Sequence, residues 1–270
     1  SPDKAADSIL VHPDVRKNLL TMKSLTEGMR ALAIWTGISL DQAEKSDDPA
    51  AKQRADDLVQ VLTPIVKSFG TDSGFLTANL GVQIFGGHGY IHEHGMEQFV
   101  RDARITQLYE GTNGIQALDL VGRKMGMHYG RYLRAFFHPV QEFIEENADD
   151  ADLQPIIFGL AKAFGRLQQA TGVLAQKGLS NPNEAAAGAM DYLNLFGYVA
   201  IAFMWAKAAK IANEKKGDGA SDFYVGKLKT ARFYYERVLP ETSSLFAKIM
   251  AGGESIMDME EELFGASVAA

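Results

Sequence analysis

Apolar residues recur every three or four positions along most of the chain, and this spacing limits the possible folds more than any other feature of the sequence. It places the apolar side chains on one face of an α-helix, whereas a half-buried β-strand would need them at every second residue. We find no convincing alternating segment and no internal repeat of fixed period. The sequence therefore predicts an all-α fold, in which antiparallel helices with short connections form bundles.

Two long helices are predicted at the start of the chain. The first begins near Val15, just after Pro13, which the first turn of a helix tolerates. The second covers residues 55–69, where we expect Pro64 to kink the helix and Gly70 to end it.

A third helix is predicted over residues 76–84, followed by a glycine-rich break. Three glycines within residues 86–89 make continued helix improbable, so the sequence predicts a loop there. A shorter helix follows, and Thr112 or Asn113 can cap the helix after it. Glu110 is therefore predicted to lie in a tight junction between two helices.

The second half of the chain consists of long predicted helices separated by polar breaks. We place a domain boundary near residue 132, which gives a first domain over residues 1–132 and a second helical domain over residues 133–270. Aromatic residues recur in the second domain, and we interpret them as core or interdomain packing. They include Phe203, Trp205, Phe223, Phe233 and Tyr234.

Composition excludes several classes of function. Hydrophobic residues make up 46% of the chain and charged residues 23%, as in ordinary globular proteins, and the formal net charge of −7 argues against nucleic acid as a partner. There is no cysteine, hence no disulfide or thiolate chemistry, and we expect a cytoplasmic protein. Glycine and charged residues interrupt the apolar runs, so no membrane span is expected. Because the chain opens with Ser1 instead of an initiator Met, we interpret it as a segment of a longer protein.

The residues that could carry chemistry are concentrated between positions 83 and 116. This stretch reads Gln-Ile-Phe-Gly-Gly-His-Gly-Tyr from Gln83, then Arg-Asp-Ala-Arg-Ile from Arg101, then Tyr-Glu-Gly-Thr-Asn-Gly-Ile-Gln from Tyr109. In order and spacing it resembles the signature of the acyl-CoA dehydrogenase family, most strongly over residues 12–123. The later bundle resembles the extra C-terminal domain of longer bacterial members, which include dehydrogenases of the 3-methylmercaptopropionyl-CoA type.

The resemblance implies a reaction. In that family a glutamate at the position of Glu110 removes the α-proton of an acyl-CoA thioester, the β-hydrogen leaves as hydride to N5 of FAD, and the product is a trans-2-enoyl-CoA. Because the α-hydrogens of a thioester are only weakly acidic, the reaction needs a well-placed base and stabilisation of the enolate-like oxygen. The resemblance also places Tyr109 and Gly111 beside the substrate.

Two segments are assigned to FAD by the same resemblance. The first matches a loop that contacts the adenosine end of the cofactor in the neighbouring subunit, and its glycines let the backbone approach closely. It contains Gln83, Ile84, Phe85, Gly86 and Gly87. The second matches flavin-contacting positions at a helix N-terminus, which favours phosphate groups, and contains Thr112, Asn113 and Gly114. Many family members have glutamine in place of Gly114, so a side-chain contact is absent there. The plainer interpretations are a helix C-terminal turn and an N-cap.

The resemblance further implies partners and alternatives. We expect an acyl-CoA substrate, electron-transferring flavoprotein as the electron acceptor, and a homo-oligomer, either a dimer or a dimer of dimers. Because the domains that cover the flavin in this family precede the present segment, the isolated chain is expected to bind FAD poorly and to be inactive. An acyl-CoA oxidase and a non-catalytic helical module, with Glu110 vestigial, remain as alternatives.

Two further polar clusters contain residue types that could carry chemistry. A histidine cluster could ligate a metal, but solvent-facing histidines are the preferred interpretation, and no metal is assigned. An arginine-rich cluster could clamp an anion, but we prefer a structural ion-pair network. The first contains His88, His92 and His94 with Glu93, and the second contains Arg101, Asp102 and Arg104.

Overall fold

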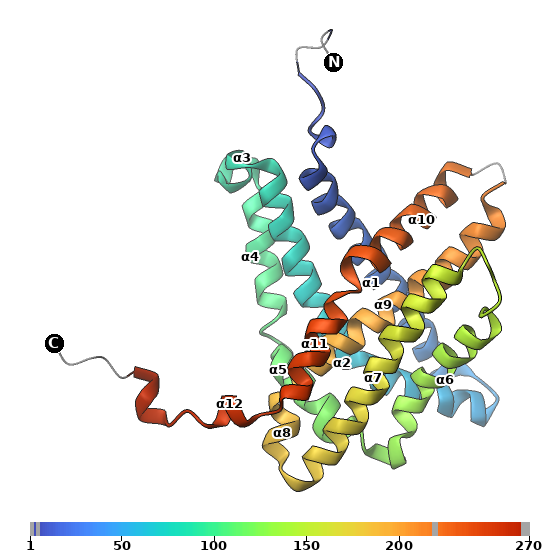
Figure 1. The fold of residues 1–270 in the computed structure, drawn as a ribbon, viewed down its shortest axis with the longest axis vertical. Helices are drawn as coiled ribbons and strands as arrows, with labels where there is room; N and C mark the ends of the chain where they lie inside the picture. Colours follow the sequence, from blue (N-terminus) through green and yellow to red (C-terminus); the bar gives the residue numbers. More distant parts are fainter. Residues whose placement is uncertain (1–2, 4–5, 218–220, 266–270) are drawn as a thin grey trace.

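A computed structural model describes residue 3, residues 6–217 and residues 221–265. All regular structure among these residues is helical, and no strand occurs in them, so the all-α prediction is confirmed. After a short 3₁₀ turn, η1 (Ile9–Val11), the chain forms two long helices, α1 (Pro13–Lys45) and α2 (Pro49–Phe85), which pack along each other (Figure 1). Each begins with proline at the first helical position, and the side chain of Asp48 caps α2 by accepting from the amide of Ala50.

The predicted break at Gly70 was wrong, because α2 continues unbroken from Pro49 to Phe85. Pro64 lies buried inside it and has no N–H to offer the carbonyl of Gln60, but Lys124 donates to that oxygen with its Nζ at 2.6 Å. Gly70 serves close packing instead, since a Cβ there would lie only 2.8 Å from the side chain of Met29 on α1. Contacts with other helices thus compensate for the hydrogen bond that Pro64 cannot make and use the space that Gly70 leaves.

The helix does end at Gly86, which has a positive φ of 59°, as the glycine-rich segment predicted. Instead of the expected loop, the chain forms two short helical turns, α3 (Gly87–Tyr90) and η2 (His92–His94). Each turn is held by a few local backbone hydrogen bonds. The next helix, α4 (Met96–Thr106), runs back along α2. Together α3, η2, α4 and the end of α2 form a protrusion from the body (Figure 1).

The chain re-enters the body through α5 (Asn113–Asp119), a π-helical turn η3 (Leu120–Lys124), a 3₁₀ turn η4 (Met127–Gly130) and α6 (Arg131–Glu146). The rest of the fold is helical as well. It consists of α7 (Gln154–Ser180), α8 (Pro182–Ala187), α9 (Ala189–Lys215), α10 (Ser221–Phe233), a π-helical turn η5 (Tyr234–Val238), α11 (Glu241–Ala251), α12 (Glu254–Met257) and a 3₁₀ turn η6 (Glu261–Gly265).

The central helix of the body is α9, which packs against α1, α2, α7, α10 and α11. Among the described residues it is the one helix long and apolar enough, by length and composition, to cross a membrane. The apolar window of α9 is 72% buried inside the protein, as in the core helix of a globular fold. The apolar side chains of α9 are therefore mostly covered by the surrounding helices.

Both halves of the chain contribute to one continuous apolar core. Its buried residues run from Leu25 on α1 to Ile249 on α11, and Phe136 on α6 contacts the rings of Trp35 and Phe196 within it. Gly197 lets α9 approach α2, since any side chain there would collide with the ring of Phe69. The boundary near residue 132 stays a prediction.

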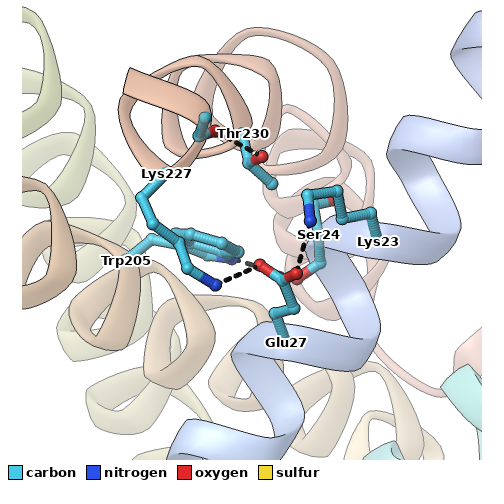
Figure 2. A network of polar contacts seen from close by, with 7 residues as sticks. Lys23, Ser24, Glu27, Trp205, Lys227 and Thr230 are labelled. Atoms are coloured by element: carbon cyan, nitrogen blue, oxygen red, sulfur yellow. Dashed lines mark hydrogen bonds and ion pairs between the residues drawn. The ribbon is translucent and has the colours of Figure 1, made fainter. Parts of the chain in front are cut away.

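A polar network also joins the two halves (Figure 2). Glu27 on α1 accepts from Lys23 at 2.6 Å and from Lys227 on α10 at 2.8 Å. The indole N–H of Trp205 on α9 donates to the carbonyl of Ser24 at 3.0 Å. Burial raises the pKa of Glu27, but the hydrogen bonds from Lys227 and Lys23 outweigh it and hold the pKa below its ordinary value.

The predicted packing roles of the aromatic residues are mostly confirmed. Phe203, Trp205 and Tyr234 are buried, and Phe233 is half-buried against the core. Phe223 is the exception, because its side chain is 60% exposed and instead lies beneath the ammonium of Lys227, 5.0 Å from the ring centre.

Candidate functional site

The backbone at Glu110 is the most unusual local feature near the predicted catalytic residues. Glu110 has a φ of 55° and Gly111 a φ of 81°, so two consecutive residues lie in the left-handed region. For a residue with a side chain this conformation costs about 1–2 kcal/mol, so surrounding contacts must hold it in place. The turn joins α4 to α5, which confirms the predicted junction between two helices.

Lys67 on α2 supplies one of these contacts. Its Nζ donates to the carbonyl of Gly111 at 2.7 Å and to Oδ1 of Asn113 at 2.8 Å. On the other side of the turn, the side-chain amide of Gln116 donates to the carbonyl of Glu110 at 3.1 Å. Both carbonyls of the left-handed pair are therefore fixed by side chains.

Asn113 is the buried centre of a second set of contacts. Its Nδ2 donates to the carboxylate of Asp72 on α2 at 2.7 Å, and its backbone N–H donates to the carbonyl of Gln107 at 3.1 Å. Gln107 in turn donates to Asp72 at 2.6 Å. The side-chain amides of Gln107 and Asn113 both donate to the carboxylate of Asp72, so hydrogen bonds hold the segment from Gln107 to Asn113 against α2.

The side chains of the turn face outward. Tyr109 is 52% exposed and Glu110 is exposed as well. Within the described part of the chain, no residue forms a hydrogen bond or an ion pair with the carboxylate of Glu110. Thr112 caps α5 by accepting from the amide of Ile115 at 3.4 Å, which confirms the predicted cap. The structure thus fixes the backbone of the turn and leaves the carboxylate available.

Gly86 and Gly87 lie at the other end of α4, at the tip of the protrusion (Figure 1). A Cβ built on either glycine would meet no atom within 4 Å, so both present open backbone. Helix α4 has 11 residues, which separates the two predicted cofactor segments by about 16 Å at the usual rise per residue. The structure brings the residues from Tyr109 to Gly114 together but keeps Gln83–Gly87 apart from them.

The histidine cluster does not converge on a point. Nδ1 of His88 lies 3.2 Å from Nε2 of His94, whereas His92 pairs with Glu97 at 3.4 Å. Among the described residues, no group of three or more histidines, cysteines or carboxylates could hold a metal ion.

The expected ion-pair network around Arg101 is absent. Arg101 and Asp102 are exposed and have no ion-pair partner among the described residues, and Arg104 donates to the side chain of Gln107 instead. The arginines lie on a helix that is itself held by α2, so no such network is needed to fix the turn.

Sequence reasoning missed Lys67 and Asp72, although both are needed to hold the turn. They lie more than 40 residues from their partners Gly111 and Asn113, so no local spacing could connect them. The available signal was weak. Lys67, Ser68, Thr71 and Asp72 interrupt the apolar pattern of α2 with polar residues, which marks a place where that helix contacts something polar.

Apolar side chains around the turn are left uncovered. Exposed large hydrophobic residues at the turn and on the adjoining parts of α4 and α5 include Ile105, Leu108, Ile115 and Leu118, and Phe85 and Phe99 are exposed further along the protrusion. Isolated apolar residues are normal on a surface, but a group of this kind beside a polar turn marks an interaction or ligand-binding site.

Comparisons with known proteins agree with this geometry. One family model, described as acyl-CoA dehydrogenase, C-terminal domain, matches residues 2–125. A second, described as acetyl-CoA dehydrogenase C-terminal like, matches residues 136–260. Together the two models cover most of the chain.

Two curated relatives match along nearly the whole chain. The 3-methylmercaptopropionyl-CoA dehydrogenase of Ruegeria pomeroyi is 39% identical over 92% of this chain and 42% of that protein. The broad-specificity linear acyl-CoA dehydrogenase FadE5 of Mycobacterium tuberculosis is 31% identical over 97% of this chain and 45% of that protein. The chain therefore spans less than half the length of these relatives.

Solved structures share the fold. ACDH-11 of Caenorhabditis elegans in complex with C11-CoA has a TM-score of 0.75 at 19% identity, over 98% of this chain and 42% of that chain. An acyl-CoA dehydrogenase from Bacillus anthracis complexed with FAD has a TM-score of 0.69 at 18% identity, over 97% of this chain and 45% of that chain.

Proposed function

Because this chain belongs to the acyl-CoA dehydrogenase family, of which it carries the C-terminal helical part, we propose that its parent protein converts an acyl-CoA thioester to the trans-2-enoyl-CoA with Glu110 as the base. The left-handed backbone at Glu110 carries this proposal. A strained, non-glycine conformation that several side chains maintain is typical of a functional site. The carboxylate of Glu110 is also exposed and has no hydrogen-bond or ion-pair partner among the described residues.

The residues of the turn have distinct roles in the proposed reaction. The carboxylate of Glu110 accepts the α-proton of the thioester, and the backbone N–H of the same residue donates to the thioester oxygen as negative charge develops there. Lys67 and Gln116 position both groups, because they hold the two carbonyls of the turn. Tyr109 and Gly111 contact the substrate on either side of Glu110.

The residues present fit FAD as the cofactor. Gly86 and Gly87 offer open backbone, and the amides of Thr112 and Gly114 at the start of α5 lie next to the base. When bound, FAD supplies the acceptor for the hydride that leaves the β-carbon. Asn113 is engaged with Asp72 and Lys67 through its side-chain amide and with the carbonyl of Gln107 through its backbone N–H, so it holds this segment in place beside the cofactor.

The separation of the two segments supports a homo-oligomer. Gln83, Ile84 and Phe85 lie near the tip of the protrusion with the two glycines, about 16 Å from Glu110, and reach the cofactor of a second copy. Exposed apolar side chains on the protrusion, among them Phe85 and Phe99, suit such a contact. We propose a dimer or a dimer of dimers in the cytoplasm that passes its electrons to electron-transferring flavoprotein.

Replacing Glu110 with glutamine in the full-length parent tests the base. Because glutamine cannot accept the proton, turnover should fall by about 10²–10⁴-fold while the visible absorption of bound FAD stays unchanged. Glu93→Gln, on the same protrusion, is the matched control and should leave turnover unaltered. Full activity in Glu110→Gln would leave only the non-catalytic helical module. Peroxide release in air by the reduced wild-type parent, without an added acceptor, would identify an oxidase instead.

The isolated chain provides a second test. Since it lacks more than half of the length of its relatives, we expect it to bind FAD poorly and to be inactive. After incubation with FAD and removal of free cofactor, the protein should show no flavin absorption band. A stoichiometric bound flavin would mean that this segment completes the cofactor site by itself.

A further inference from the structure

The end of the described chain forms an arm that stands off the body. This C-terminal arm, residues 254–265, contains α12 and η6 and extends away from the other helices (Figure 1). All of its residues are exposed, including large apolar ones, and Phe264 is 76% exposed. The exposed apolar residues are Ile256, Met257, Met259, Leu263 and Phe264, and the acidic ones are Glu254, Asp258, Glu260, Glu261 and Glu262. An arm that is both apolar and acidic suits a surface that is apolar and basic.

The direction of the arm is fixed at its root. Gly252 has a positive φ of 79°, and the amide of Gly253 donates to the carboxylate of Glu184 at 3.2 Å. Lys177 on α7 pairs with the same carboxylate at 3.4 Å. Because the body holds the first residues of the arm, the arm leaves in a set direction instead of folding back.

A groove with the complementary character lies elsewhere on the molecule. It has a volume of about 980 Å³ and is formed by the end of α1, the start of α2, α6 and α9. Its apolar lining includes Trp35, Leu58 and Phe203. A groove of this size can take several apolar side chains of a peptide segment.

The rim of the groove is basic. Arg54, Arg134 and Lys207 line it, and the ammonium of Lys207 lies 5.7 Å from the ring centre of Trp35. The buried carboxylate of Asp57 is paired with Arg131 at 2.7 Å, so it does not cancel the remaining cations. Glu142 is the other carboxylate among the described lining residues, and Asp48 lies 4.0 Å from Arg54, so Arg134 and Lys207 supply the excess of positive charge in the groove.

We propose that the C-terminal arm of one copy docks into this groove of a second copy, and that the exchange is reciprocal in a two-fold dimer. The arm and α8 lie on one side of the body in Figure 1 and α6 on another, and the pinned root keeps the arm from its own groove. Two identical chains satisfy both surfaces at once, because each supplies one arm and one groove. The inference is independent of the flavin chemistry.

Charge exchange tests the contact directly. One variant carries Glu260→Lys, Glu261→Lys and Glu262→Lys in the arm, and a second carries Arg54→Glu and Lys207→Glu in the groove. Both sets are exposed, and Arg131 is left in place because it neutralises buried Asp57. In either variant alone, arm and groove have the same sign of charge, so the dimer dissociation constant should rise by at least about tenfold in sedimentation equilibrium.

An equimolar mixture of the two variants should dimerise again, because the lysine arm meets the glutamate groove while the other arm and groove are both native. The matched control is Glu146→Lys, Asp149→Lys and Glu214→Lys, which changes the net charge as the arm variant does but lies outside the arm and the groove; its dimer should be unaffected. Native dimerisation in both single variants, a native chain that stays monomeric at all concentrations, or no dimer in the mixture would each overturn the proposal.

Discussion

The body of the molecule and the turn at Glu110 are stabilised in opposite ways. In the body, α9 is enclosed by other helices and aromatic rings pack around Phe136, which is fully buried. At the turn, Tyr109 and Glu110 are exposed, and the backbone is held by hydrogen bonds from Lys67 and Gln116. Apolar burial stabilises the first region, whereas a few directed polar contacts shape the second.

This difference shows which part of the site the chain completes by itself. The backbone of the turn is already in place, because all of its polar partners lie within the described residues. The carboxylate itself is exposed, and so are its apolar neighbours in the chain, Leu108 and Ile115. A change in the body should therefore affect global stability, and a change at the turn should mainly affect local order and, in the parent, turnover.

The largest effect is expected from Phe136→Ala in the body. Removing this ring leaves a cavity among Trp35, Phe196 and Phe203, and the free energy of unfolding should fall by about 3–5 kcal/mol. Urea denaturation measures it. Phe158→Ala is the control, because that ring is 71% exposed, and its loss should cost less than about 0.5 kcal/mol. Equal losses in the two variants would show that the body is not stabilised by this core.

Asn113→Ala should have a smaller effect on the whole fold. The substitution removes the buried side-chain amide that donates to Asp72 and accepts from Lys67, and the free energy of unfolding should fall by about 2 kcal/mol. Asn183→Ala, at an exposed position, is the matched control in the same denaturation experiment. If Asn113→Ala costs as much as Phe136→Ala, the turn is part of the body's cooperative core and the contrast between the regions fails.

Lys67→Met should reduce the local order of the turn while changing the stability of the whole fold only slightly. Loss of the bond to the carbonyl of Gly111 should change the free energy of unfolding by less than about 1 kcal/mol, since the side chain is only half-buried. Hydrogen exchange at residues 107–113 should accelerate, and turnover of the parent should drop about tenfold because Glu110 is misplaced. Lys229→Met, on the exposed face of α10, should change neither quantity. Unaltered exchange would show that Lys67 does not position the turn.

The smallest effect is a pH dependence in the body. Because the pKa of Glu27 is lowered in the folded state, its contacts with Lys227 and Lys23 stabilise the fold above pH 4.5, the ordinary pKa, and this contribution is lost as pH falls through the lowered value. Glu27→Gln should therefore cost less than about 1 kcal/mol at pH 7 and less still at pH 3. Thermal unfolding at the two pH values, with exposed Glu44→Gln as the control, measures it; an equal loss at both would exclude the ion pair as the cause.

Local sequence determined the helical class and the position of the turn. Apolar spacing was enough for the helices because one face of each must be buried, and it located the start of α1 to within a few residues. Thr112 as a cap and the glycine after Glu110 predicted the helix junction, because capping and left-handed backbone depend on residue type at one or two positions. The motif around Glu110 likewise identified the family.

Only the tertiary structure decided where local rules are overridden. Helix α2 continues past Pro64, where Lys124 satisfies the freed carbonyl of Gln60, and past Gly70, where the absence of a side chain leaves room for Met29 on α1. Lys67 could not be connected to Glu110 from the sequence, since their proximity depends on how α2 packs against the turn. Long-range contacts of this kind have no fixed spacing along the chain, whereas helix periodicity and capping do.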